Sequence, residues 1–423
     1  MSTAELIRPR PSHRIAPRWE NPLREISSRK AVFDFLPMNS MRERSISESF
    51  SRFKERRLAI LQDDVQGVAR AILLAPAHDI TPDTVNRMIS LSGGIVFAAL
   101  SPERAAGFLL DPMARPRVSS VERRVDSDPL NFCISVEARE GVSTGISAAD
   151  RAVTLQVLGA SEIQPRRLVQ PGHIFPVEVR AGGVLVKNAL PEGAVDIVSL
   201  AGFTDAAAFI DLLSPAGDLL LGERVAEFAE LHKIPLISLS ELTRFRLETE
   251  KVVYRVAEAK LPTKLAGELR SIIYKSTIHG GEHLALVKGE IDPNEPLLTR
   301  VQPEHTFADV FGGSSPRSRE QLQRCLAEIG RRGQGVIVYL RRPSPGELHQ
   351  LIDSVSQPTP PAKALMREYG LGAQILRDLG ARKIELLTGS KKDLVGLESF
   401  GLEIVSQIPL PSGIPSHPSE SQR

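Results

Sequence analysis

The stretch Glu137-Ala-Arg-Glu-Gly-Val-Ser-Thr-Gly-Ile-Ser-Ala-Ala-Asp-Arg151 contains the most informative local pattern in this chain. The apolar run 132–136 before it is typical of a buried strand. Ser147 precedes a helical pattern at 148–158, and serine is a favoured N-cap because its hydroxyl accepts a hydrogen bond from a free backbone N–H. The stretch therefore predicts a strand, a hydroxyl-rich turn and a helix.

A hydroxyl-rich turn before a helix suits an anion, because unpaired N–H groups and the positive end of the helix dipole face it. Ser143, Thr144 and Ser147, with Arg151 in the first turn of the helix, are therefore predicted phosphate-binding residues. The alternative is that Ser147 only caps the helix and that His173, further along the chain, only packs in the fold.

Similar alternations of apolar runs and helical patterns extend in both directions. Strands are expected at 58–61, 94–100, 335–340 and 383–388, and helices at 81–92, 320–331 and 372–379. These patterns predict an α/β (α+β) fold with two mixed-sheet domains in series. The expected organisation is a disordered basic arm at 1–50, domains at 51–245 and 246–412 that join within 238–250, and a disordered tail at 413–423.

The composition sets outer limits on function. The 423 residues are 42% hydrophobic, which is enough for two cores, and the net charge of +2 gives no indication of nucleic acid or an anionic membrane. Cys133 and Cys325 are too few for a multi-thiolate metal site and are expected to be buried, reduced thiols. Without an apolar run of roughly 20 residues or a signal peptide, we expect a cytoplasmic protein.

The first half resembles 3,4-dihydroxy-2-butanone 4-phosphate synthase over residues 57–246. Besides the opening stretch, the resemblance rests on Ile80-Thr-Pro82, Pro171-Gly-His-Ile-Phe-Pro176, Gly182-Gly-Val-Leu185 and Ala194-Val-Asp196. It implies conversion of ribulose 5-phosphate into a four-carbon phosphate and formate, with a divalent cation and acidic residues.

That chemistry needs oxygen ligands for Mg²⁺ and a carboxylate as general base. The family's acidic block is broken after Asp64, where two glutamate positions are Val68 and Arg70. The family's second metal ligand, a histidine, is replaced by Leu190, and Glu192 alone survives from that segment. The magnesium site and the ancestral reaction are therefore expected to be lost.

The second half resembles GTP cyclohydrolase II over residues 281–410. The resemblance rests on blocks such as His283-Leu-Ala-Leu-Val-Lys-Gly289, Asp309-Val-Phe-Gly312 and Tyr369-Gly-Leu-Gly-Ala-Gln-Ile-Leu-Arg-Asp-Leu-Gly380. It implies hydrolysis of GTP with a zinc ion that three cysteines hold. Those positions are His305, Pro316 and Ser318 here, so the zinc site is also expected to be lost.

The second half nevertheless keeps basic residues that the resemblance places near a nucleotide. Arg367 corresponds to the family's arginine proposed to attack the α-phosphate, although the acidic residue two positions before it is Leu365. Four other residues could either form a basic phosphate-binding pocket or lie on ordinary solvated surface, and the sequence leaves both alternatives open. They are Arg300, Arg341, Thr388 and Lys392.

Together the two resemblances indicate a paralogue of the bifunctional riboflavin biosynthesis protein. The favoured function is a homodimeric binding or regulatory protein for a phosphorylated small molecule, without metal or cofactor. Association with riboflavin-pathway enzymes is part of this expectation. The alternative is a divergent enzyme on a sugar phosphate or nucleotide, and whether the protein is catalytic is left open. The candidate catalytic residues for that alternative are His173, Glu192, Asp211, His305 and Arg367.

Overall fold

The computed structural model describes residues 46–64, 70–113, 130–278, 281–312, 318–341, 362–388 and 402–410, with side chains of helix α11 described from residue 370. Most of the expected arm and all of the expected tail lie outside these ranges. Residues 46–50, at the end of the expected arm, form the start of helix α1 (Ile46–Arg56). They join the fold because the rings of Phe50 and Phe53 are buried in the first domain.

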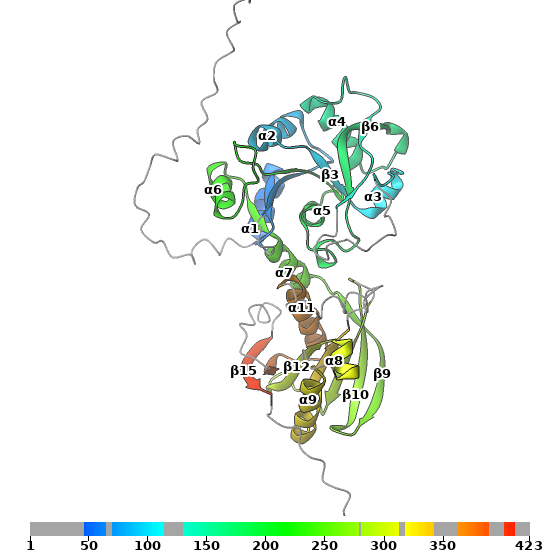
Figure 1. Ribbon diagram of the computed structural model, residues 1–423, viewed down its shortest axis with the longest axis vertical. Helices are drawn as coiled ribbons and strands as arrows, with labels where there is room; N and C mark the ends of the chain where they lie inside the picture. The colour runs from blue at the N-terminus through cyan, green and yellow to red at the C-terminus, as the bar shows by residue number, and fades with distance from the viewer. Residues whose placement is uncertain are drawn as a thin grey trace, which may run out of the picture. The chain divides into compact units, whose positions relative to one another are not determined.

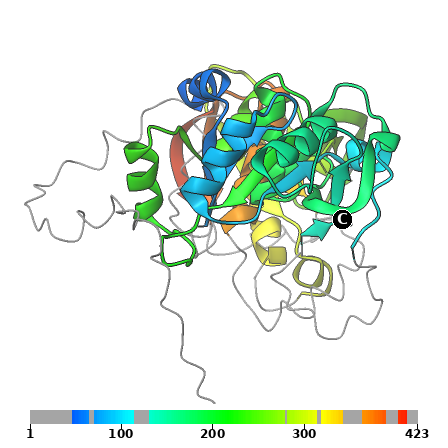
Figure 2. The ribbon, with the colours of Figure 1, turned by 90° about the horizontal axis from the view of Figure 1, so that it is seen from above.

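The first domain is built on a mixed sheet of eight strands (Figures 1 and 2). Seven strands follow the order β4-β6-β3-β7-β2-β1-β8, and β5 pairs with β6 beside them. The strands are β1 (Ala59–Gln62), β2 (Ala71–Pro76), β3 (Phe97–Leu100), β4 (Asn131–Phe132), β5 (Val136–Ala138), β6 (Leu168–Glu178), β7 (Ala206–Asp211) and β8 (Leu236–Ser238). The pairs β3/β6 and β1/β8 are parallel, whereas β1/β2, β2/β7 and β3/β7 are antiparallel.

Helices cover both faces of this sheet because successive strand residues point to opposite sides. Leu73 packs in one apolar cluster with residues of α2 and α4, and its neighbour Leu74 packs in another with residues of α1, α5 and α7. The helices are α2 (Pro82–Ser92), α3 (Pro102–Gly107), α4 (Ala148–Gly159), α5 (Leu190–Leu200), α6 (Glu223–Leu231) and α7 (Leu239–Thr249), with short 3-10 helices η2 (Pro165–Arg167) and η3 (Gly183–Leu185).

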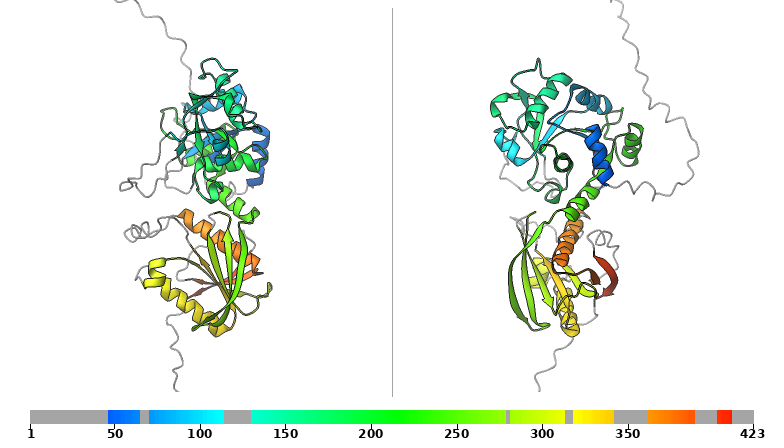
Figure 3. Two further views of the ribbon diagram at one scale, coloured as in Figure 1. Left: turned by 90° about the vertical axis from the view of Figure 1, so that its right-hand side faces the viewer. Right: turned by 180° about the vertical axis from the view of Figure 1, so that it is seen from behind.

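The second domain contains a seven-stranded mixed sheet in the order β15-β14-β12-β13-β11-β10-β9 (Figure 3). The strands are β9 (Val253–Thr263), β10 (Gly267–Ser276), β11 (Glu282–Lys288), β12 (Leu297–Pro303), β13 (Gly335–Leu340), β14 (Lys383–Thr388) and β15 (Glu403–Pro409). The pairs β12/β13, β12/β14 and β14/β15 are parallel. The pairs β9/β10, β10/β11 and β11/β13 are antiparallel. The described helices are α8 (Thr306–Phe311), α9 (Ser318–Arg332) and α11 (Ala362–Asp378).

The alternation of side chains also explains the two apolar layers of the second domain. Val338 lies in a cluster with residues of α11, whereas its neighbour Ile337 lies in a cluster with Cys325 and Ile329 of α9. Cys325 and Cys133 are both buried and free, as predicted. The predicted fold class of two mixed-sheet domains in series is confirmed.

Several predicted elements differ from the observed ones. The run 132–136, predicted as one strand, is divided between β4 and β5, which both pair with β6. Strand β3 begins at Phe97 instead of residue 94, because Gly93 ends helix α2 in a left-handed conformation and the chain turns there. Helix α11 begins at Ala362, ten residues before the predicted start. The residues of the predicted junction 238–250 form helix α7 and its caps, and Ser238 and Glu241 make a capping box at its start. No helix in the described ranges is long and apolar enough to cross a membrane.

Candidate functional site

The predicted phosphate turn is folded around the carboxylate of Asp150. Asp150 accepts hydrogen bonds from the N–H of Ser143 (3.0 Å), the hydroxyl of Ser143 (2.8 Å) and the N–H of Gly145 (3.0 Å). These bonds from Ser143 and Gly145 hold the pKa of Asp150 at about 2. The N–H groups of Ser143 and Gly145, which lie in the predicted phosphate turn, thus donate to a carboxylate of the protein itself.

Ser147 is the N-cap of helix α4. Its hydroxyl accepts the N–H of Asp150 at 3.0 Å, so the capping role that the sequence analysis left open is observed. The side chains of Ser143, Thr144 and Ser147 remain exposed at the surface. The turn therefore keeps hydroxyl groups that a ligand can reach, around an internal anion that fixes its shape.

Arg151 lies in helix α4, four residues after Ser147. Its Nε atom is buried and has no hydrogen-bond partner among the described residues. Burial lowers the pKa of Arg151, which records the cost of placing this charge away from water. A partly desolvated guanidinium is a chemically suitable anion partner.

A Glu137–His173 pair borders the same turn. His173 Nδ1 lies 2.9 Å from Glu137 Oε2, and the side chain of His173 is 44% exposed whereas that of Glu137 is 13% exposed. Gly145 is pressed against this pair, because a Cβ atom on Gly145 would lie 1.7 Å from Glu137 Oε1. Sequence reasoning quoted Glu137 within the motif but did not select it, since only the pairing of β5 with β6 brings it to His173.

The acidic residues near the family's metal position have partners within the protein. Asp64 accepts hydrogen bonds from the N–H of Ser240, at 3.1 Å, and from its hydroxyl. Asp211 Oδ1 lies 2.8 Å from Arg70 Nη2. Val68 lies outside the described residues. Arg70, at one of the family's glutamate positions, thus forms an ion pair with one of the candidate catalytic carboxylates.

Glu192 and Leu190 lie at the start of helix α5. Leu190 is 6% exposed and belongs to an apolar cluster of the first domain. Glu192 is 2% exposed, and its Oε1 lies 3.4 Å from the N–H of Arg180 and 3.8 Å from Lys187 Nζ. The three first-domain candidates His173, Asp211 and Glu192 therefore take part in three separate sets of contacts.

The second-domain candidates gather at the carboxyl ends of parallel strands β12, β13 and β14. His305 follows β12, Arg341 follows β13, and Thr388 ends β14. The side chain of Arg341 is 52% exposed and lies 3.8 Å from Glu304. This edge is where open α/β sheets bind ligands. Arg367 is part of helix α11 but its side chain is not described, and Lys392 lies outside the described ranges.

Arg300, predicted at this pocket, has other partners. Its guanidinium donates to the side-chain oxygens of Gln302 and Gln321 and to the carbonyl of Leu387 at 3.0 Å. These bonds tie β12 to β14 and α9. Arg300 thus has a structural role in joining these elements. Its contact with a phosphate has not been tested and stays a prediction.

Two of the three positions that the resemblance assigns to zinc ligands, His305 and Ser318, are described, and both make hydrogen bonds within the protein. The N–H of His305 donates to Asp309 Oδ2 at 2.8 Å, and the same oxygen accepts the hydroxyl of Tyr339 at 2.6 Å. Burial and Asp309 raise the pKa of Tyr339. Ser318 is 1% exposed and accepts a hydrogen bond from Gln302 at 2.6 Å. Across the described ranges, His, Cys, Asp and Glu form no group of three or more suited to a metal.

The fold defines a class of proteins with two mixed-sheet α/β domains in series. Residues 47–245 match the family model for 3,4-dihydroxy-2-butanone 4-phosphate synthase, and residues 254–409 match that for GTP cyclohydrolase II.

Relatives with both domains are similar over most of the chain. The chain is 33% identical to riboflavin biosynthesis protein RibBA of Aquifex aeolicus, over 86% of this chain and 92% of the relative. It is also 33% identical to monofunctional riboflavin biosynthesis protein RIBA 2, chloroplastic, of Arabidopsis thaliana, over 86% and 77%. The chain therefore belongs to the family of RibBA riboflavin biosynthesis proteins.

A solved structure shows the same arrangement of elements. RibBX of A. baumannii, described as a two-domain 3,4-dihydroxy-2-butanone 4-phosphate synthase, is 27% identical with a TM-score of 0.71, over 86% of this chain and 99% of that one.

Proposed function

We propose that this protein has lost both ancestral reactions of its family and acts as a binding or regulatory protein for a phosphorylated small molecule. The observation that carries the proposal is the ion pair between Arg70 and Asp211, which puts a fixed cation where the family resemblance expects a carboxylate. The proposal includes the absence of bound Mg²⁺ and Zn²⁺, a homodimeric and cytoplasmic state, and association with enzymes of the riboflavin pathway.

The chemistry of the first domain supports the loss of catalysis. A hard cation needs several oxygen ligands, and a guanidinium next to one of the remaining carboxylates opposes its binding. Leu190 has no lone pair and lies in the apolar cluster. Because each missing acid or base typically costs 10²- to 10⁴-fold in rate, several losses together bring the reaction close to the uncatalysed rate.

The second domain supports the same conclusion independently. Zinc with an activated water needs three strong protein ligands. His305 has one imidazole to offer, whereas Ser318 is buried and hydrogen-bonded to Gln302. A neutral hydroxyl in that setting is a poor replacement for a thiolate.

Retained anion binding is supported by the turn at residues 143–147. Asp150 holds the turn in shape and accepts the hydroxyl of Ser143, Thr144 is exposed, and Arg151 Nε is a buried donor without a partner among the described residues. This arrangement provides hydroxyl and guanidinium donors but fewer free N–H groups than an open helix N-terminus. We therefore expect weak to moderate affinity for a phosphate ester.

A thermal-shift screen with ribulose 5-phosphate, GTP and inorganic phosphate tests the proposal. A ligand at about 100 times its dissociation constant stabilises the native state by about 2.7 kcal/mol. Thr144→Leu and Arg151→Gln should each abolish the shift, whereas Ser161→Leu, at an exposed position beyond helix α4, should leave it unchanged. No shift with any of the three compounds would overturn the binding role.

The second candidate function is a divergent enzyme acting on a sugar phosphate or nucleotide. The contact between His173 and Glu137 favours it, because a carboxylate that orients an imidazole is a common general-base arrangement. A ligand from the screen that is consumed, at a rate that His173→Asn and Glu137→Gln abolish, would establish this function. A ligand that remains unchanged after prolonged incubation would support the binding role.

A further inference from the structure

The segment at residues 180–187 is held by two buried carboxylates of helix α5. Glu192 accepts the N–H of Arg180, and Asp196 Oδ2 accepts the N–H of Val184 at 2.8 Å. Gly183 makes this approach possible, because a Cβ atom at that position would lie 2.0 Å from Asp196 Oδ1. The backbone of the segment is therefore fixed by the helix that carries the candidate residue Glu192.

Val184 of the same segment is buried in the first-domain cluster, but the two residues after it pack with the second domain. Leu185 is 1% exposed and lies in the second-domain cluster with Leu247, Val252 and Leu371. Val186 packs against that cluster as well. The segment thus joins the polar framework of the first domain to the apolar core of the second.

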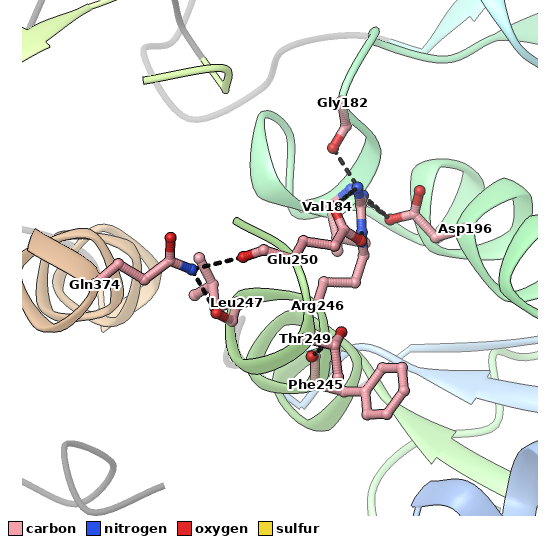
Figure 4. A network of polar contacts seen from close by, with 9 residues as sticks. All are labelled: Gly182, Val184, Asp196, Phe245, Arg246, Leu247, Thr249, Glu250 and Gln374. Carbon is pink, nitrogen blue, oxygen red and sulfur yellow. Dashed lines mark hydrogen bonds and ion pairs between the residues drawn. The ribbon is translucent and has the colours of Figure 1, made fainter. Parts of the chain in front are cut away.

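Arg246 of helix α7 connects the segment to the end of its own helix (Figure 4). Its Nη1 atom donates to Asp196 Oδ2 and to the carbonyl of Gly182, both at 2.8 Å. Its Nε and Nη2 atoms bind the two oxygens of Glu250 at 2.6 and 2.8 Å. Planar guanidinium geometry is required for this double contact, which a lysine cannot reproduce.

Gln374 of helix α11 continues the connection into the second domain (Figure 4). Its amide nitrogen donates to the carbonyls of Leu247 (2.5 Å) and Glu250 (2.8 Å), and its amide oxygen accepts the N–H of Val252 at 2.9 Å. The last carbonyls of a helix have no partner within the helix, so one glutamine satisfies both the end of α7 and the start of the next strand.

We propose that residues 180–187, Arg246 and Gln374 form a coupling path through which a change at Glu192 is transmitted to helix α11. The regulatory meaning of the path rests on the proposed function, in which the first domain binds a ligand. The path itself does not depend on a ligand. Each link is a hydrogen bond or an apolar contact between partly or fully buried groups, so a shift at one end leaves unpaired donors or acceptors at the next.

Amide hydrogen exchange on the full-length protein without ligand tests the path. In Arg246→Lys, amides at 182–186 and at 370–378 should both exchange about tenfold faster or more, because the charge-assisted contacts that hold the path are lost. Gln374→Met replaces the side chain by one of similar volume at the opposite end of the path. In this variant too, the amides at 182–186 should exchange about tenfold faster or more. Strands β3 and β7 provide the internal reference for global stability.

Lys251→Ala is the matched control. Lys251 Nζ lies 3.4 Å from Asp378 Oδ1 and its side chain is 70% exposed, so this variant also breaks a contact to α11, but outside the path. We expect no change at 182–186. If Arg246→Lys accelerates only 182–186, or if Gln374→Met accelerates only 370–378, the two ends are uncoupled and the inference is overturned.

The same measurement separates this inference from the function proposed above. If no phosphate compound shifts the melting temperature in the screen, the proposed binding role is overturned. The coupling measured without ligand does not depend on that result. Conversely, ligand binding without communication between 182–186 and 370–378 would retain the binding role and refute the path.

Discussion

Arg70 Nη2 lies 2.8 Å from Asp211 Oδ1, across the antiparallel pair formed by strands β2 and β7. The side chains are 45% and 28% exposed, respectively. The pair neutralises one of the candidate catalytic carboxylates. Arg70 therefore places a cation where the family resemblance expects a glutamate.

Arg70→Gln should cost less than about 1 kcal/mol in the free energy of unfolding, because partly exposed ion pairs are weak. Urea denaturation of this variant, of Asp211→Asn and of the double variant measures the coupling between the two residues. A coupling well above about 1 kcal/mol would contradict the expected weak pair. None of the variants should release formate from ribulose 5-phosphate with Mg²⁺ beyond a control without protein.

Purified protein should contain far less than stoichiometric zinc. The physical reason is that His305 is the one imidazole left at the family's three thiolate positions, while Ser318 is committed to Gln302. Elemental analysis after growth with added zinc checks this, with a family member that has all three cysteines as the positive control. One zinc per chain, lost in His305→Ala, would refute this interpretation of the second domain.

Asp150 should contribute stability in a pH-dependent manner. Its folded pKa of about 2 lies below the ordinary aspartate value of about 3.9, so its contribution is complete above about pH 4 and disappears as the pH falls through about 2. The difference in melting temperature between wild type and Asp150→Asn should be constant from pH 5 to 7 and shrink below pH 4. Asp218→Asn, at the surface, controls for removal of one charge. A difference that does not shrink would argue against the bonds from Ser143.

Gly183→Ala should destabilise the protein by about 2 kcal/mol or more. Gly183 has φ of +59°, and an added Cβ would collide with the carboxylate of Asp196. A left-handed conformation alone costs about 1 to 2 kcal/mol for a residue other than glycine. Gly217→Ala is the matched control, since Gly217 has φ of +87° and nothing within 4 Å of an added Cβ. Equal losses in the two variants would show that the contact with Asp196 has no energetic weight.

Both faces of each sheet are covered by helices, and this explains why several strands were predictable from their apolar runs. In the predicted strand 335–340, the neighbours Ile337 and Val338 lie in two different apolar clusters, as expected for a strand covered on both sides. The cap at Ser147 marks the start of α4 from neighbouring residues alone. These signals are local in sequence. The family resemblance added the order of the two domains, which the matches at 47–245 and 254–409 agree with.

The sequence by itself determined the residue types at the ancestral metal positions, and with them the missing ligands at Leu190 and Ser318. Tertiary structure alone decided how the remaining groups are paired: Arg70 with Asp211, Glu137 with His173, and Gln374 with the end of α7. These partners are separated by 141, 36 and 124 residues, respectively. Hydrogen bonds and ion pairs act over a few ångströms in space, so a linear pattern cannot specify them until strand pairing and helix packing bring the partners together.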